Sequence, residues 1–336
     1  MNNRDAKLRD VALLQANGRF LDARDVLAKA VSMTPEDPVL LQALHNVTLE
    51  IVMVQQREIL SNLTQTLNRT AHSLFQLLIR DLQSDDRYAD PKRLERFGFS
   101  VGSQNEEDGM LAEVFRRIGE GTRTFFEFGV GNGLQNCTYF FLLSGWKGWW
   151  VEIEPNKVNF MRNHFAKAIN EGRLVIDDTP IDAENIEQRC DYLNIPDSID
   201  LLSIDIDGND YHVFDAMKRV NARVVLLEYN GVFPPPMRVV GAYDRNYRYE
   251  EHTYIGASLQ SITDLAESKG YQLVGCNITG LNCIFVRKDL ADGKFPYPAT
   301  PEHLYNTSRH QLAWGGAFGQ GPRANYGPLH ENSALS

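Results

Sequence analysis

From residue 108 onward, short apolar runs alternate with amphipathic stretches, and this order limits the fold more than any other feature of the chain. The alternation is typical of strands that lie parallel in one sheet and are joined by helices on its faces. Only residues 277–281 separate the last two apolar runs, which is too short for a crossover, so we expect an antiparallel hairpin there. The expected strands are residues 124–128, 148–152, 173–176, 199–204, 224–227, 272–276 and 282–287, and the expected helices are residues 134–144, 156–170, 185–192, 211–217 and 259–268. We therefore predict an α/β fold with a doubly wound, mostly parallel, seven-stranded sheet.

A separate α-helical arm is predicted for residues 1–85. Apolar residues recur at helical spacing on both sides of a break between Pro35 and Pro38, and residues 18–35 resemble a single tetratricopeptide unit. No proline or glycine interrupts the chain from about residue 39 to residue 82, where apolar residues recur at three- and four-residue steps. This stripe either packs on the chain's own main domain or joins copies of the chain into a homo-oligomer. The remaining divisions are predicted as a linker at 86–100, the main domain at 101–290 and an irregular tail at 291–336.

The charge balance bears on the kind of partner. There are 34 basic and 44 acidic side chains, so the formal net charge is 34 − 44 = −10. An acidic chain without a local basic patch is repelled by nucleic acid and by anionic membranes, which favours a small neutral or cationic ligand. The four cysteines lack C-x-x-C spacing, and no apolar run is long enough to span a membrane. We expect reduced cysteines and a cytoplasmic location.

A glycine-rich turn follows the first expected strand, in the sequence EFGVGNG at residues 127–133. Glycines allow positive φ angles and let a ligand approach the main chain. The second expected strand ends in VEIEP at residues 151–155, which places an acid about twenty residues beyond the turn, where it can bind ribose hydroxyls. The turn lacks the Gly-Lys-Ser/Thr ending of a P-loop and the glycine spacing of a dinucleotide fingerprint. Glu127, the acid on the strand side of the turn, suits a positively charged or amino-acid-like ligand better than a pyrophosphate.

These motifs resemble those of class I S-adenosylmethionine-dependent methyltransferases. Two further stretches, SQNEEDG at residues 103–109 and DLLSIDIDGNDY at residues 200–211, are similar to the FkbM-type group of O-methyltransferases. The resemblance covers roughly residues 100–290. It implies that Glu152 holds the cofactor ribose, with Glu154 as the alternative, and that Asp178 flanks the adenine. The other cofactor residues that it implies are Gln104, Asp108, Glu127, Gly129, Gly131 and Asp205.

Polar residues of the fourth and fifth expected strands should meet at one edge of the sheet, because ligands of open α/β sheets bind beyond the carboxyl ends of the strands. Asp207 and Asp210 are candidates for the base that removes a proton from an acceptor hydroxyl. Alternatively, Asp207, Glu228 and Asn230 supply the oxygen ligands that Mg²⁺ prefers. His252, in the long connection that follows, is a candidate proton shuttle.

The resemblance and these residues together predict an O-methyltransferase that uses S-adenosylmethionine and acts on a hydroxyl of a sugar, a glycan precursor or a secondary metabolite. Two other interpretations stay open. One is a nucleotide-dependent oxidoreductase, which the glycine spacing and the closing hairpin disfavour. The other is a non-catalytic adaptor whose helical arm recruits a partner. The acids present at both the expected cofactor site and the expected acceptor site disfavour it.

Overall fold

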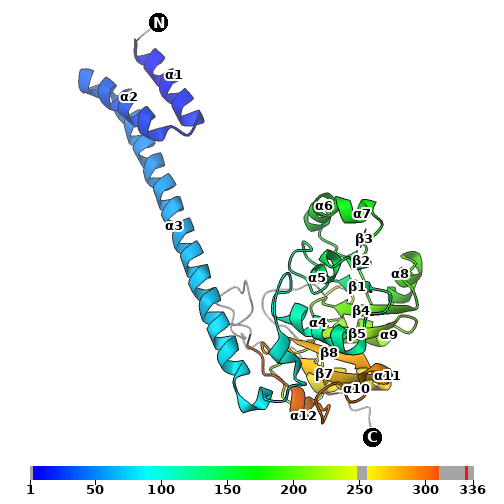
Figure 1. Cartoon of the computed structure of the whole chain (residues 1–336). Coiled ribbons are helices and arrows are strands. Elements are labelled where there is room, and N and C mark those ends of the chain that lie inside the picture. Colours follow the sequence, from blue (N-terminus) through cyan, green and yellow to red (C-terminus); the bar gives the residue numbers. More distant parts are fainter. Residues whose placement is uncertain (1–2, 248–255, 310–329, 332–336) are drawn as a thin grey trace. The chain divides into compact units, whose positions relative to one another are not determined.

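A computed structural model of the chain describes residues 3–247, 256–309 and 330–331 (Figure 1). Contacts within the chain divide it into two compact units, Met1–Leu74 and Phe75–Ser336. Within the described residues, no helix combines the length and the apolar character needed to cross a bilayer.

The first unit is α-helical. It contains α1 (Asn3–Ala16), α2 (Phe20–Met33) and the first part of α3 (Pro38–Gln83), so the arm has two breaks instead of the one that we predicted. The first break falls at Gly18, whose φ of 71° suits a residue without a side chain. The Asp37 carboxylate accepts a hydrogen bond from the Val39 amide (2.9 Å) and starts α3. Leu27, Leu40 and Val47 are among the buried residues that join the three helices.

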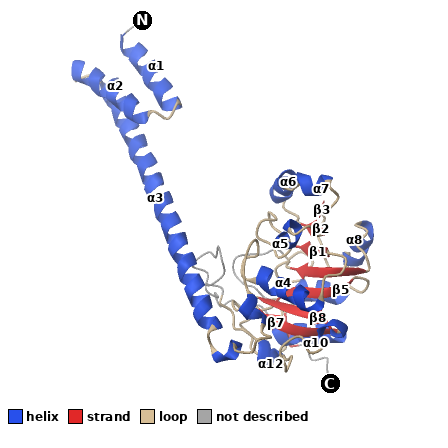
Figure 2. Ribbon diagram, viewed as in Figure 1, coloured by secondary structure: helices blue, strands red, loops and turns tan. Residues whose placement is uncertain are grey.

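The second unit is built on a seven-stranded sheet with the strand order β3-β2-β1-β4-β5-β8-β7 (Figure 2). The strands are β1 (Thr124–Phe128), β2 (Lys147–Val151), β3 (Leu174–Asp177), β4 (Ser198–Ile204), β5 (Asn221–Glu228), β7 (Tyr271–Cys276) and β8 (Asn282–Arg287). The pairs among β1 to β5 are parallel, and β8 is antiparallel to both β5 and β7. The predicted mostly parallel sheet with a closing hairpin is confirmed. The strand order reverses between β1 and β4, where such sheets bind ligands.

Helices cover both faces of this sheet, and neighbouring β1 residues contribute to different cores because side chains alternate along a strand. Phe126 and Phe128 pack with α8 (Ile186–Tyr192), α9 (Asp210–Ala216) and α10 (Leu259–Ser268). Phe125 packs on the other face, and the helices there are α4 (Glu107–Ile118), α5 (Tyr139–Leu143), α6 (Pro155–His164), α7 (Ala166–Asn170) and α11 (Lys288–Ala291). The smaller elements are α12 (Pro301–Leu304), two 3-10 turns at Asp86–Tyr88 and Leu94–Phe97, and a short antiparallel pair of β6 (Val239–Val240) with β9 (His330–Glu331).

The short helices α11 and α12 were not predicted, and three larger differences from the predicted helices affect the core or the site. The helix expected at 134–144 begins only at Tyr139, because the Cys137 and Thr138 amides donate hydrogen bonds to Glu127 instead of joining a helical turn. The helix expected at 156–170 is two helices that meet at Phe165, whose ring packs against Trp150. Helix α4 was not predicted, although its apolar residues face the core.

Candidate functional site

A cavity of about 880 Å³ opens at the carboxyl ends of β1, β2, β4 and β5. This volume lies within the range of about 300–1,000 Å³ that is common for small-molecule sites. Nine of the residues that we singled out from the sequence line it: Gln104, Glu127, Gly129, Gly131, Glu152, Glu154, Asp205, Asp207 and Glu228. The cavity lies at the reversal of strand order, as expected for an open α/β sheet.

The glycine turn forms one wall of this cavity. Gly129 has a φ of 83°, and a Cβ atom there would lie 1.4 Å from the backbone oxygen of Asp205. Only glycine therefore lets the turn reach the end of β4. Gly131 also has a left-handed φ, 59°, but no atom lies within 4 Å of a Cβ built on it. The main chain at Gly131 is thus open to a ligand in the cavity.

Glu127 anchors the glycine turn from inside the protein. Its carboxylate accepts five hydrogen bonds, two of them from the Cys137 and Thr138 amides. The side chains that donate the other three are Asn136, Thr138 and Ser203, at 2.6–3.0 Å. Burial raises the pKa of Glu127, and these hydrogen bonds oppose that shift. Because the donors occupy the carboxylate, Glu127 borders the cavity mainly as a structural support.

Glu152 lies at the end of β2 with one carboxylate oxygen engaged. Its Oε1 atom accepts hydrogen bonds from the Ile153 and Glu154 amides, both at 2.9 Å, and Oε2 accepts none from the described part of the chain. Glu154, in contrast, is half-exposed and pairs with Lys157 at 2.8 Å. Of the two acids, Glu152 is therefore the one whose carboxylate is held in place and still has an oxygen that accepts no hydrogen bond from the described residues.

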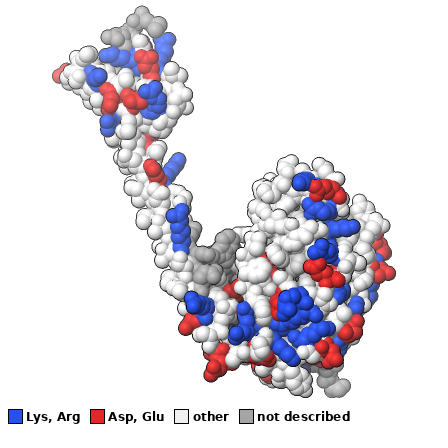
Figure 3. Space-filling model, viewed as in Figure 1, with Lys and Arg blue, Asp and Glu red and all other residues white. Residues whose placement is uncertain are grey.

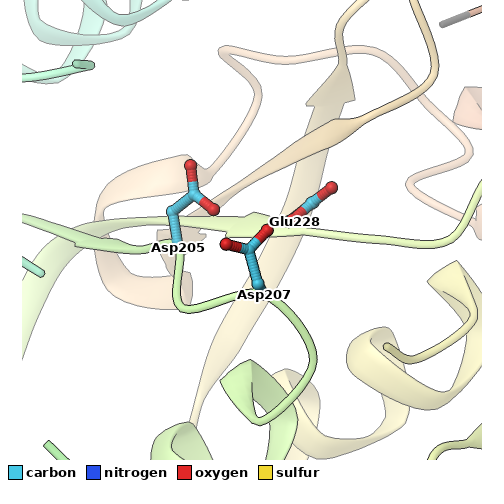
Figure 4. A group of neighbouring side chains, drawn as sticks. All are labelled: Asp205, Asp207 and Glu228. Carbon is cyan, nitrogen blue, oxygen red and sulfur yellow. The ribbon is translucent and has the colours of Figure 1, made fainter. Parts of the chain in front are cut away.

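Three carboxylates gather at the other side of the cavity (Figure 4): Asp205 and Asp207, after β4, and Glu228, at the end of β5. One oxygen from each lies within 4.8 Å of the other two. No hydrogen bond to these carboxylates is formed by the described residues. Asp207 itself is held at a φ of 54°, a conformation that aspartate tolerates better than most residues.

The surroundings of this group raise its pKa values, although Asp205 is exposed at the cavity and Glu228 is half-buried. The protein around the cavity raises the pKa of both carboxyls above their usual range, and their negative neighbours raise it further. Burial also raises the pKa of Asp207, although the nearby Lys157 ammonium lowers it. At neutral pH the group therefore has a strong tendency to take up a proton or a cation.

Two of the predicted acceptor-side residues point elsewhere. Asp210 is buried and accepts hydrogen bonds from the Ile206 and Gly208 amides, so it holds the turn that carries Asp207. Asn230 is buried as well, and its side-chain oxygen accepts a hydrogen bond from the Val232 amide (3.0 Å). Neither residue lines the cavity. His252 lies outside the described residues.

Two of the predicted cofactor residues also lie outside the cavity lining. The Asp108 carboxylate accepts hydrogen bonds from the amides of residues 101–103, at 2.6–3.1 Å, and shapes the loop that carries Gln104. Asp178 is exposed and pairs with Arg162 at 3.0 Å. Asp108 thus supports the cavity wall indirectly, whereas Asp178 lies on the protein surface, away from the cavity lining.

Sequence reasoning missed several residues that line the cavity. Glu107 accepts hydrogen bonds from Asn277 (2.6 Å) and Asn282 (2.8 Å), which ties the start of α4 to the β7–β8 hairpin. Arg245 pairs with Asp182 at 2.8 Å across the entrance loops. Glu107 lies inside the SQNEEDG motif, and Arg245 lies in the long connection that also contains the candidate proton shuttle His252. Both could have been singled out on those grounds.

No family model matches the chain, and no curated protein matches it either. Solved structures similar to it are S-adenosylmethionine-dependent methyltransferases, but the identity is low. A putative caffeoyl-CoA O-methyltransferase from Staphylococcus aureus is 14% identical, with 65% of this chain and 99% of that chain covered and a TM-score of 0.39. A TehB-like methyltransferase from Corynebacterium glutamicum is 14% identical, with 53% and 86% covered and a TM-score of 0.32. The strand order itself shows a doubly wound, Rossmann-like α/β fold with a closing antiparallel hairpin.

Proposed function

We propose that this protein is an S-adenosylmethionine-dependent O-methyltransferase that acts on a hydroxyl of a small molecule. The observation that carries the proposal is the composition of a single cavity. One side has an open glycine main chain and a fixed acid with one oxygen that accepts no hydrogen bond from the described residues. The other side has three carboxylates that likewise accept none from the described part of the chain. A nucleoside cofactor needs close approach to the main chain and an acid for its ribose hydroxyls. A hydroxyl acceptor needs a carboxylate that can take up its proton.

The residues at the first side fit the cofactor. Glu152 would accept hydrogen bonds from the ribose hydroxyls through Oε2, while the backbone amides hold its Oε1 atom. Gly131 leaves room for the cofactor against the main chain, and Gln104 lines the cavity beside it. When bound, S-adenosylmethionine supplies an electrophilic methyl group. Glu127 keeps the glycine turn in the shape that receives the cofactor.

At the second side, Asp207 is the proposed general base. A hydroxyl is a poor nucleophile until its proton leaves, and a carboxylate with a raised pKa accepts that proton more readily than an ordinary one. The hydroxyl proton would move to an Asp207 oxygen as the acceptor oxygen attacks. Asp210 supports this role by fixing the turn that carries Asp207.

The same carboxylates favour a divalent cation as the alternative way to activate the hydroxyl. Asp205, Asp207 and Glu228 together supply the hard oxygen ligands that Mg²⁺ and Mn²⁺ prefer. Asp205 replaces Asn230 in this version of the proposal, because the Asn230 oxygen is occupied by a backbone amide. Positive charge there would relieve the repulsion among the three acids.

The acceptor in this proposal is neutral or cationic, since the acids lining the cavity repel an anion. A sugar or another polyol fits because carboxylates accept hydrogen bonds from several hydroxyls at once. The similarity of the motifs to the FkbM-type group supports the same substrate class.

Calorimetry with the full chain tests the cofactor. We expect S-adenosylmethionine to bind and NAD⁺ not to bind. Glu152→Gln should weaken binding by about tenfold, or about 1.4 kcal/mol, whereas Glu154→Gln is the matched control and should bind as tightly as the native chain. Failure of the native chain to bind S-adenosylmethionine would overturn the proposal. Binding that is equally weakened by both variants would remove Glu152 from the ribose site.

A further inference from the structure

Helix α3 carries an apolar stripe that the described residues of the two units leave exposed. Its members are from 48% to 69% exposed, although large aliphatic side chains usually find a partner in a long helix. They are Leu49, Met53, Leu60, Leu63, Leu67, Leu74 and Leu77.

The spacing of this stripe is that of a coiled coil. Met53, Leu60, Leu67 and Leu74 follow each other at seven-residue steps and occupy the a positions of a heptad repeat. The matching d positions are Leu49, Gln56, Leu63, Thr70 and Leu77. The seam is thus apolar except at two d positions, Gln56 and Thr70.

The residues of α3 that pack within each unit belong to a different face. In the first unit, Leu40 and Val47 are buried and Ile51 is partly buried against them, and these residues fall at b and f positions of the same heptad. In the second unit, Phe75 and Ile79 pack with Tyr88 and Ile278, and they also fall at b and f positions. Positions b and f lie nearly opposite a and d on a helix. Among the residues that the structure describes, the packing within each unit therefore leaves the a/d seam uncovered.

The charge pattern along the seam favours a copy of the same chain as the partner. The e and g positions that flank it in coiled coils hold few charged residues between residues 49 and 80, namely Glu50, Arg57 and Arg80. Coiled coils that choose a different partner usually do so through charges at these positions. Figure 3 likewise shows few charged side chains over the middle of α3. A seam of this kind is complementary to itself.

We propose that two copies of this chain associate through residues 49–77 of α3 as a parallel, in-register coiled coil. In this arrangement Gln56 meets Gln56 of the second copy and Thr70 meets Thr70, so each buried polar group has a hydrogen-bonding partner. In an antiparallel pair, a positions face d positions, and both polar residues would face methionine or leucine. The polar pairs thus fix the orientation and the register.

Light scattering on the full chain gives the first test. We expect twice the 38.1 kDa mass of one chain. The double variant Leu60→Asp/Leu67→Asp, with two charges in the seam, should have the mass of a single chain. The matched control is Ser61→Asp/Gln65→Asp, which places the same charges on exposed b and f positions and should keep the doubled mass. Circular dichroism checks that both variants retain the helical content of the native chain. A native chain with the mass of one copy, or of three or more, would overturn the proposal.

Cysteine cross-linking tests the orientation. Under mild oxidation, Thr70→Cys should form a covalent dimer because the two new thiols meet in a parallel, in-register pair. Gln65→Cys, on the outer face, should form none above the background of the native chain, which has its own four cysteines. A chain that is dimeric by light scattering but does not cross-link through Thr70→Cys would contradict the parallel register.

Discussion

Glu127 and Asp207 are carboxylates on neighbouring strands of one cavity, yet their surroundings are opposite. Glu127 accepts five hydrogen bonds from residues that the glycine turn and β4 bring to it. Asp207 lies beside two other acids, Asp205 and Glu228, and none of the three accepts a hydrogen bond from the described residues. The first carboxylate is used to build the site, whereas the other three are left able to bind a proton, a cation or a hydroxyl.

This contrast shows that an acid at the end of a strand does not by itself indicate chemistry. What separates a supporting acid from a reactive one is whether its oxygens are already occupied. A supporting acid stabilises the fold, and its removal leaves buried donors unpaired. A cluster of unpaired acids destabilises the fold, because each disfavours the charge of the others. The two groups should therefore respond in opposite directions to the same kind of substitution.

The largest effect should come from Glu127→Ala. The substitution leaves two backbone amides and the Ser203 hydroxyl without their acceptor inside the protein, at a cost of about 3–5 kcal/mol in the free energy of unfolding. Denaturant unfolding measures it. Asp178→Ala, which removes an exposed acid and its surface ion pair, should cost less than about 1 kcal/mol. Equal losses in the two variants would show that the hydrogen bonds of Glu127 do not hold the turn.

A divalent cation should stabilise the protein through Asp205, Asp207 and Glu228. At a Mn²⁺ concentration of about 100 times the dissociation constant, the gain is about 2.7 kcal/mol, and thermal unfolding with increasing Mn²⁺ measures it. Asp207→Asn should abolish the stabilisation, while Asp178→Asn should leave it intact. If Mn²⁺ has no effect on the native chain, the cation version of the proposed function fails and the base version stands.

Without a cation, Glu228→Gln should raise the free energy of unfolding by about 1–2 kcal/mol at about pH 8. The pKa of Glu228 is raised in the folded state, so its proton is bound more tightly there than in the unfolded chain. Its contribution to stability is therefore fully present below the unfolded pKa and is lost as the pH rises through the folded pKa. Asp210, with its pKa raised to about 6, acts in the same direction. The gain from Glu228→Gln should shrink toward about pH 5, and unfolding curves at both pH values measure it. A loss of stability at the higher pH would contradict the proposed repulsion.

The sheet could be predicted from the sequence because its pattern is local. Residues 124–128 and 259–268 were predicted with the bounds that the structure has, since alternation and helical spacing are set within a few residues. Asp205, Asp207 and Glu228 could be predicted to lie close together because ligands of open α/β sheets bind beyond the carboxyl ends of the strands. The predicted start of α5 was wrong because it depends on Glu127, a residue outside the helix. The Cys137 and Thr138 amides donate hydrogen bonds to Glu127 and therefore do not form a helical turn.

The orientation of single side chains at the site could not be predicted in the same way. Asp207 and Asp210 are three residues apart in one turn, but the first lines the cavity and the second caps the backbone. Glu228 and Asn230 differ likewise, two residues apart. Which residue of each pair faces the cavity depends on the hydrogen bonds of the folded loop. The spacing of residues in the sequence does not predict these hydrogen bonds.

Gly131→Ala tests the cofactor side of the cavity and should change stability only modestly. It should cost about 1–2 kcal/mol, because alanine pays for a left-handed φ even where space is available. Gly145→Ala is a matched control: its φ is also left-handed, at 86°, with open space around a Cβ, but Gly145 does not line the cavity. Both variants should lose similar stability in denaturant, yet only Gly131→Ala should also weaken S-adenosylmethionine binding by calorimetry, since its methyl group enters the space against the main chain. If the two variants bind the cofactor equally well, the glycine turn does not contact the cofactor. The cofactor side of the cavity would then have to be assigned to other residues.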